Sequence, residues 1–204
     1  MTTKPTSTTE RETRVWAGGE VRAVKADGKT TLHGYAAVYD QRSLPIYGMF
    51  YEIVRRGAFA RALKGEDDVC ALVEHDSGRV IGRNRAKTLR LSDDEKGLKF
   101  EIDLPDTTDG RDLATSIDRG DISQMSFGFR KIKDRWTEER TSDGILVETR
   151  ELLEVELFDV SPVAWGQYPQ TEVALRSRQE WRESLRTGAD VQRLARLRLA
   201  EAER

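Results

Sequence analysis

The sequence is poor in the residues that disulfides and metal centres require. Its 204 residues include one cysteine, Cys70, and two histidines, His33 and His75. A single cysteine excludes an internal disulfide and a zinc site built from several cysteines, and two histidines leave little room for a histidine-rich metal centre. We therefore expect no metal ion and no cofactor. Any chemistry that needs an imidazole must use one of these two histidines.

Net charge and long apolar runs are also lacking. The 34 Lys and Arg residues nearly balance the 36 Asp and Glu residues, so binding to nucleic acid through bulk charge is not expected. No run of 18 apolar residues occurs, which excludes a membrane-spanning helix. The first residues also lack the apolar stretch of a signal peptide. The sequence thus predicts no direct nucleic-acid role and no membrane association.

Charged residues are abundant, at 34% of the chain against about 25% in a typical globular domain. This composition predicts one domain with solvated ends. We expect a disordered N-terminal arm over residues 1–13, a folded domain over 14–175 and a charged helical tail over 176–204. The tail has eight arginines and five acidic residues, so it is either a solvated helical segment or a docking segment for a partner.

Between the two ends, short segments rich in Val, Leu, Tyr and Phe alternate with Gly, Asp and Ser, which is typical of strands. Eight strands are expected, at residues 20–24, 31–39, 69–74, 88–91, 98–102, 126–131, 145–152 and 155–160. Helices are expected at 57–64 and 109–119, the second capped by Asp109. The pattern predicts a mainly β fold with surrounding helices (α+β), arranged as an antiparallel sheet system or barrel.

Two of these segments carry side chains suited to acyl transfer. His75 follows the apolar run 69–74 and precedes Asp-Ser-Gly, so a rigid strand would present its imidazole beside an accessible loop. Ser123 and Ser126 lie within 121–129, and a serine hydroxyl becomes a nucleophile only when a base takes its proton. Taken singly, His75 is better explained as a surface or partly buried histidine, and each serine as a residue on the polar face of a strand.

A third segment, residues 151–162, is rich in carboxylates. Strand alternation places Glu154 and Glu156 on one face and Asp159 on the other, among apolar side chains. A carboxylate can orient a histidine by accepting a hydrogen bond from its second ring nitrogen. Because Asp159 interrupts an apolar face, we expect it to have a partner or to lie at the rim of the sheet. Spacing alone does not show that serine, histidine and carboxylate meet.

Two other kinds of catalytic site are less favoured by the pattern. A cysteine hydrolase would pair Cys70 with His75, but residues five apart on an extended strand face opposite sides. A metal hydrolase would have to rely on carboxylate ligands, which the sequence leaves open.

Five motifs, taken in order, resemble the prohead maturation proteases of tailed bacteriophages. The resemblance covers most of the chain, from about Val15 to Leu175. One such motif would be weak, whereas the combination at these separations is fairly specific. The motifs are GYAAVY at 34–39, EIVRRGAF at 52–59, LVEH at 72–75, DISQMSFGF at 121–129 and LEVELFDVSPV at 153–163.

The resemblance implies a fold shared with the herpesvirus assembly proteases, an antiparallel β-barrel surrounded by helices. It also implies the site residues. Ser126 corresponds to the nucleophile, with Ser123 as the weaker alternative, and His75 corresponds to the general base. The third herpesvirus residue is a second histidine, and the similar segment here begins with Glu154. We therefore expect Glu154 to orient His75, with Asp159 as the second choice.

The role that the resemblance implies is capsid maturation. A serine endopeptidase of this family would lie inside the procapsid, in the host cytoplasm. There it would cleave the scaffold or the delta segment of the major capsid protein, and itself. The implied partners are the major capsid protein, the scaffold and a second copy of the chain in a homodimer. The alternative is a non-enzymatic scaffold or assembly protein that keeps the protease fold.

Overall fold

The computed structural model describes residues 11–15, 20–165 and 174–188 of the chain. The chain divides into two compact units, Met1–Gln170 and Thr171–Arg204. The described part of the second unit is a single helix over 174–188. The tail predicted from residue 176 is therefore helical as far as 188, and its remainder lies outside the described residues.

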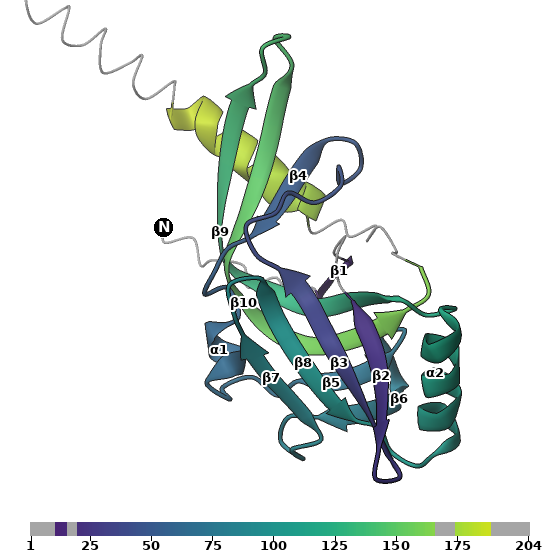
Figure 1. The fold of residues 1–204 in the computed structure, drawn as a ribbon. Helices are drawn as coiled ribbons and strands as arrows, with labels where there is room; N and C mark the ends of the chain where they lie inside the picture. Colours follow the sequence, from purple (N-terminus) through teal and green to yellow (C-terminus); the bar gives the residue numbers. More distant parts are fainter. Residues whose placement is uncertain (1–10, 16–19, 166–173, 189–204) are drawn as a thin grey trace, which may run out of the picture. The chain divides into compact units, whose positions relative to one another are not determined.

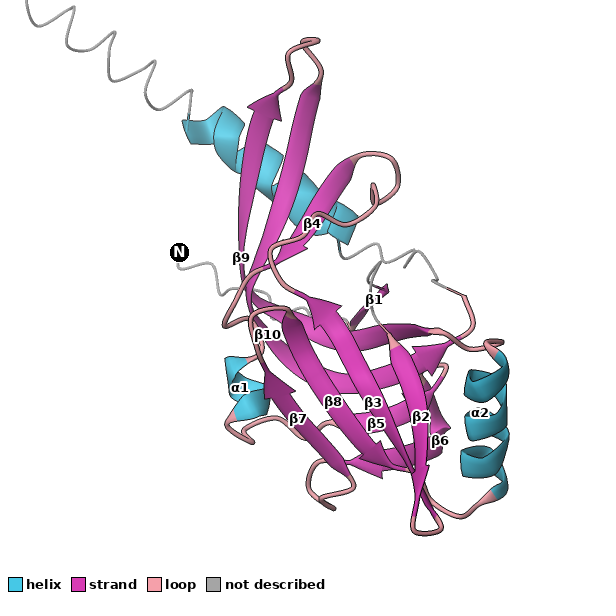
Figure 2. Ribbon diagram, viewed as in Figure 1, coloured by secondary structure: helices cyan, strands magenta, loops and turns pink. Residues whose placement is uncertain are grey.

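The first unit is built mainly from strands, with few helices, so the mainly β class is confirmed (Figures 1 and 2). No helix in the described ranges is long and apolar enough to cross a membrane. Its elements are β1 (Glu12–Val15), β2 (Val21–Ala26), β3 (Lys29–Val38), β4 (Phe50–Val54), α1 (Ala60–Leu63), β5 (Cys70–Val73), β6 (Asp76–Arg83), β7 (Leu89–Asp93), β8 (Gly97–Asp103), α2 (Thr108–Arg119), β9 (Gln124–Arg140) and β10 (Leu146–Val163).

The strands form two sheets that share one hydrophobic core. One sheet has the order β1-β9-β10-β5-β6, with β4 also paired to β10, and the other has the order β2-β3-β8-β7. Leu32 and Phe100 of the second sheet are fully buried in the same cluster as Phe127 and Val160 of the first. Figure 2 shows that the β9–β10 hairpin continues well past the four-stranded sheet.

Strand direction differs from the prediction at one edge of β10. Both β4 and β5 run parallel to β10, so the expectation of a purely antiparallel arrangement is wrong there. The two strands follow the same edge in succession, because β4 pairs with 148–152 and β5 pairs with 159–160. Between them the chain makes the short helix α1, and the carbonyl of Ala58 still accepts from the amide of Val155 at 3.0 Å.

Several element boundaries also differ from the prediction. The two strands expected at 145–152 and 155–160 are one continuous strand, β10, which is interrupted only by bulges. Strands β4 and β6 lack the strict apolar alternation that would have revealed them. Helix α2 is capped by Thr107, whose hydroxyl accepts from the Gly110 amide at 3.3 Å, and not by Asp109. The helix ends at Gly120, which has a left-handed φ of 83°.

The end of the predicted N-terminal arm is ordered. Residues 1–10 lie outside the described part, but Glu12–Val15 form β1, which pairs antiparallel with β9. The prediction of disorder through residue 13 is therefore wrong for its last residues. Charge led to that prediction, and charge is also what orders the strand, because Glu12 and Arg14 are buried in ion pairs.

A buried ion cluster joins β1 to β4, β9 and β10. At its centre, Arg150 is fully buried and forms a two-pronged contact with Glu12, at 2.9 and 3.1 Å. Arg150 also donates hydrogen bonds to the carboxylates of Glu52, from Nη1 at 3.1 Å, and Asp134, from Nε at 2.8 Å. Burial alone would raise the pKa of Glu12, but Arg14 and Arg150 outweigh it and hold this pKa below its ordinary value of 4.5.

We predict that Arg150→Met destabilises the first unit by about 3–5 kcal/mol, because it removes one of the two buried arginines that pair with Glu12 and Glu52. The matched control is Arg90→Met, which removes an exposed arginine from its pairs with Glu101 and Asp103 and should cost at most about 1 kcal/mol. Urea unfolding followed by tryptophan fluorescence measures both. Equal, small losses for the two variants would contradict this assignment.

Candidate active site

His75 lies in the tight turn that joins β5 to β6. Val73 pairs with Asp76, so the loop consists of Glu74 and His75 alone. Both residues have positive φ values, 54° and 60°, as a two-residue type I′ turn requires. Asn and Gly favour this conformation, whereas Glu and His adopt it at a cost of order 1–3 kcal/mol per residue. Backbone strain of this kind is typical of residues at active sites.

The turn is fastened to the end of β10. The amide of Glu74 donates to the carbonyl of Pro162 at 3.1 Å. The Glu74 carboxylate accepts from the amide of Ala164 at 2.6 Å. These two contacts fix the turn beside the residues that follow Asp159 on β10, and so set the position of the imidazole.

Ser126 lies on β9, the central neighbour of β10, and is 1% exposed. It stands opposite Ser161 of β10 on one side and Val15 of β1 on the other. Its neighbours Met125 and Phe127 are fully buried in the core. The strand therefore holds the Ser126 hydroxyl on a rigid backbone, at an edge that β1 covers.

The three side chains meet in a hydrogen-bonded line. The Nε2 atom of His75 is 2.6 Å from the Oγ atom of Ser126, and its Nδ1 atom is 2.5 Å from Oδ2 of Asp159. Carboxylate oxygens accept hydrogen bonds, so Nδ1 carries the hydrogen in neutral His75. That tautomer leaves Nε2 free to take the Ser126 proton.

The Asp159 carboxylate is almost completely buried, and donors hold both of its oxygens. Oδ2 accepts from the Ser161 hydroxyl at 2.6 Å as well as facing His75. Oδ1 forms an ion pair with Arg11, which precedes β1. A bulge between Leu157 and Asp159 changes the register of β10 at this point, and bulges of this kind redirect side chains next to functional sites.

The partner of Asp159 across the ladder is Gly128 of β9. A Cβ atom at Gly128 would lie 2.0 Å from Oδ1 of Asp159 and 2.7 Å from Nε of Arg11. The space that the carboxylate occupies therefore exists because residue 128 has no side chain.

Glu154 does not occupy the position expected of it. It stands opposite Lys133, five residues before Asp159, which corresponds to about 15 Å along a strand. The imidazole of His75 contacts Asp159 instead. The geometry thus favours the second choice from the sequence, since the bulged strand turns Asp159, and not Glu154, toward the β5–β6 turn.

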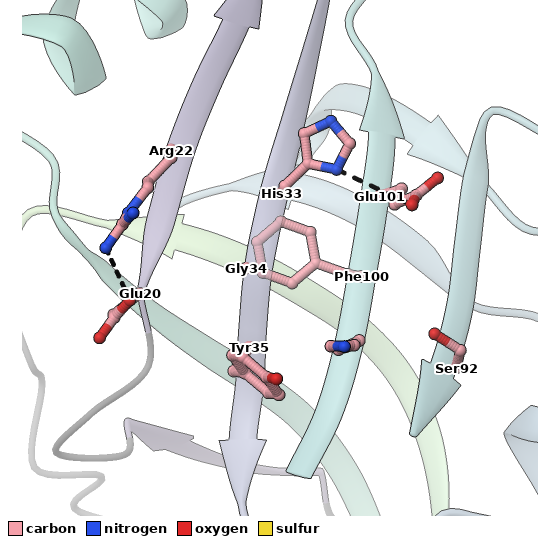
Figure 3. Close-up of a pocket in the computed structure, with 9 residues that line it drawn as sticks. Glu20, Arg22, His33, Gly34, Tyr35, Ser92, Phe100 and Glu101 are labelled. Carbon is pink, nitrogen blue, oxygen red and sulfur yellow. Dashed lines mark hydrogen bonds and ion pairs between the residues drawn. The ribbon is translucent and has the colours of Figure 1, made fainter. Parts of the chain in front are cut away.

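The remaining candidates lie apart from this line of side chains. Ser123 is exposed and precedes β9. Burial raises the pKa of the Cys70 thiol, which disfavours the nucleophilic thiolate. His33 lies on the other sheet, where it faces Glu101 across 3.8 Å within a surface hollow (Figure 3). The hollow's lining includes none of the three residues of the candidate site.

Sequence reasoning did not anticipate Arg11, Arg14 or Ser161 at the site. Ser161 could have been found from the sequence, because it lies two residues after Asp159 in the motif at 153–163, and side chains two apart share a strand face. Arg11 belonged to the arm expected to be disordered, and Arg14 lay at the predicted start of the folded domain, where no motif marked it. Within the described ranges, no cluster of three or more His, Cys, Asp or Glu side chains is arranged to hold a metal ion.

A serine hydroxyl that faces an imidazole, which in turn faces a buried carboxylate, is the arrangement found in serine hydrolases. Comparison with known proteins gives the family. The model of the caudovirus prohead serine protease family, Peptidase_S78, matches residues 19–184. The chain belongs to this family, as the motifs in its sequence predicted.

A solved structure, the bacteriophage T4 capsid assembly protease gp21, is similar with 14% sequence identity and a TM-score of 0.48. The match covers 77% of this chain and 97% of the T4 protein. No curated protein sequence matches the chain.

We predict that Gly128→Ala lowers serine reactivity by at least about a hundredfold, because the new methyl group displaces the carboxylate that orients His75. Labelling with a fluorophosphonate probe, followed by mass spectrometry, measures the rate. Gly188→Ala is the control, since a Cβ atom there meets nothing within 4 Å and the residue has no left-handed φ. An unchanged labelling rate in folded Gly128→Ala would refute the steric argument.

Proposed function

We propose that this chain is a serine endopeptidase of phage capsid maturation, with Ser126 as nucleophile, His75 as general base and Asp159 as the orienting carboxylate. The observation that carries the proposal is the line from Ser126 Oγ through His75 to Asp159, with contacts of 2.6 and 2.5 Å. Membership of a serine protease family supports the same reading.

In the proposed mechanism, His75 Nε2 takes the hydroxyl proton as Ser126 Oγ attacks the scissile carbonyl carbon. The imidazolium that forms is stabilised by the Asp159 carboxylate at Nδ1. His75 then returns the proton to the leaving amine, and the acyl group remains on Ser126. A water molecule activated by the same imidazole releases the acyl group and restores the serine. Ser161 and Arg11 hold the Asp159 carboxylate in place.

The proposed biological targets are those that the family resemblance implies. We propose that the enzyme acts inside the procapsid in the host cytoplasm, on the scaffold or the delta segment of the major capsid protein, and on itself. The fold would then be a variant of the herpesvirus assembly protease fold, in which the second histidine is replaced by Asp159. A homodimer remains a prediction.

We predict that Ser126→Ala abolishes self-cleavage and probe labelling, with a loss of at least about a thousandfold. Ser123→Ala removes the exposed serine nearby and should keep the parent rate. Intact-mass analysis over time, with and without co-expressed capsid protein, follows both variants.

If self-cleavage persists in Ser126→Ala and stops in Ser123→Ala, the nucleophile is Ser123 and not Ser126. A parent protein that neither labels nor cleaves in the presence of capsid protein would instead favour the non-enzymatic assembly role.

We predict that Asp159→Asn lowers peptide cleavage by about 10³–10⁴-fold, because the amide favours the wrong imidazole tautomer. Glu154→Gln, a matched change on the same strand, should change the rate by less than about threefold, as expected of a side chain remote from the reaction. Steady-state rates on a capsid-derived peptide discriminate the two carboxylates. The reverse ranking would restore Glu154 as the orienting residue.

A further inference from the structure

Strand β1 lies at the nucleophile in the manner of a bound substrate. It adds an antiparallel strand to the edge of β9, with Val15 opposite Ser126, and proteins commonly bind extended peptides by adding a strand to a sheet edge. The Oγ atom of Ser126 is 3.0 Å from the carbonyl oxygen of Arg14. The peptide group between Arg14 and Val15 is thus the one that the nucleophile touches.

The side chain that precedes this peptide group fills a built, charged site. Arg14 is 2% exposed. Its guanidinium contacts both carboxylate oxygens of Glu52, Nε at 2.7 Å and Nη2 at 3.2 Å. The guanidinium carbon also lies 5.4 Å from the ring centroid of Phe129. This site suits arginine better than any other side chain, because a planar guanidinium can pair with a carboxylate through two donors and also pack against an aromatic ring.

A second complementary pair lies two residues earlier on β1. Side chains two apart share a strand face, and Glu12, like Arg14, points into the buried cluster. Its carboxylate forms the two-pronged contact with Arg150 at 2.9 and 3.1 Å. The intervening Thr13 is on the other face and only half-buried. The rest of the protein thus provides Glu52 as the partner of a cationic side chain on the bound strand and Arg150 as the partner of an anionic one.

We propose that this enzyme selects peptides of the form acidic–any–arginine and cleaves after the arginine, with Glu52 and Arg150 as the specificity-determining residues. The bond between Arg14 and Val15 is then its self-cleavage site. The proposal rests on the endopeptidase function proposed above and adds its substrate preference. When β1 leaves, Glu52, Asp134 and Arg150 remain, and this acidic excess favours a new cationic side chain.

The cleavage step balances with the groups present. In the structure Ser126 Oγ contacts the carbonyl oxygen of Arg14. For attack the peptide group turns so that its carbonyl carbon faces Oγ, which bonds to that carbon as the hydroxyl proton moves to His75. The bond from this carbon to the Val15 nitrogen breaks, and the proton passes to that nitrogen. Water then hydrolyses the Arg14 ester, giving a free carboxylate on Arg14, a new N-terminus at Val15 and the original Ser126.

The first test follows self-cleavage in the full chain by intact mass. The parent should lose residues 1–14 and no other N-terminal segment. Arg14→Lys should slow this cut by less than about tenfold, and Arg14→Glu by at least about a hundredfold, since it places two carboxylates together in a buried site. Thr13→Ala, on the opposite face, is the control and should keep the parent rate.

The second test removes any effect on folding, because it varies the substrate. A peptide with the sequence of residues 10–19, which also resupplies the Arg11 that trimming removes, is offered to the self-trimmed parent enzyme, beside peptides carrying R14E, R14Q or E12K. We expect cleavage of the first peptide between arginine and valine, and at least about a hundredfold lower kcat/KM for R14E. With Glu52→Gln enzyme, the preference for the arginine peptide over R14Q should fall by at least about tenfold, through a raised KM.

The outcomes separate the two proposals. Ser126 labelling by a fluorophosphonate probe reports on the endopeptidase function, and the position of the cut reports on the specificity. Normal labelling with a cut at another bond, or equal rates for the arginine and R14E peptides, would overturn the specificity and leave the function standing. A parent enzyme that neither labels nor cuts would overturn both.

Discussion

Strand β10 carries two buried charges, Arg150 and Asp159, and several distant parts of the chain supply the groups that pair with them. Arg150 is surrounded by Glu12, Glu52 and Asp134, and Asp159 by His75, Ser161 and Arg11. A buried charge without a partner costs several kcal/mol, so β10 requires groups from distant parts of the chain. Those groups come from β1, β4, β9 and the β5–β6 turn. The pairing orders the N-terminal strand and assembles the candidate site at the same time.

The candidate site concentrates the local irregularities of this fold. His75 and its neighbour Glu74 adopt positive φ values, β10 is bulged before Asp159, and Gly128 leaves room for the carboxylate. The buried strands supply the rigidity. The irregular positions bring the three side chains into one line, with 2.6 Å between the hydroxyl and the imidazole and 2.5 Å between the imidazole and the carboxylate.

Motifs and composition predicted a large part of this. Most strand segments and the two helices follow from local patterns in the sequence, whereas the pairing of Ser126 with His75 was implied by the family resemblance. The choice between Glu154 and Asp159 did not follow, because it depends on a bulge that alternation cannot reveal. Strand β1 was missed for a similar reason. Its charged side chains indicate solvent exposure unless their partners, far away in the sequence, are known.

The sequence by itself determined the mainly β class, the family and the short list of residues able to perform acyl transfer, because only two histidines and few motif serines were available. The tertiary structure decided which carboxylate faces His75 and where the N-terminal strand lies. Both depend on contacts between residues more than 80 positions apart, Asp159 with His75 and Arg150 with Glu12. Such contacts are set by the register and direction of β10, which no local pattern in the sequence encodes.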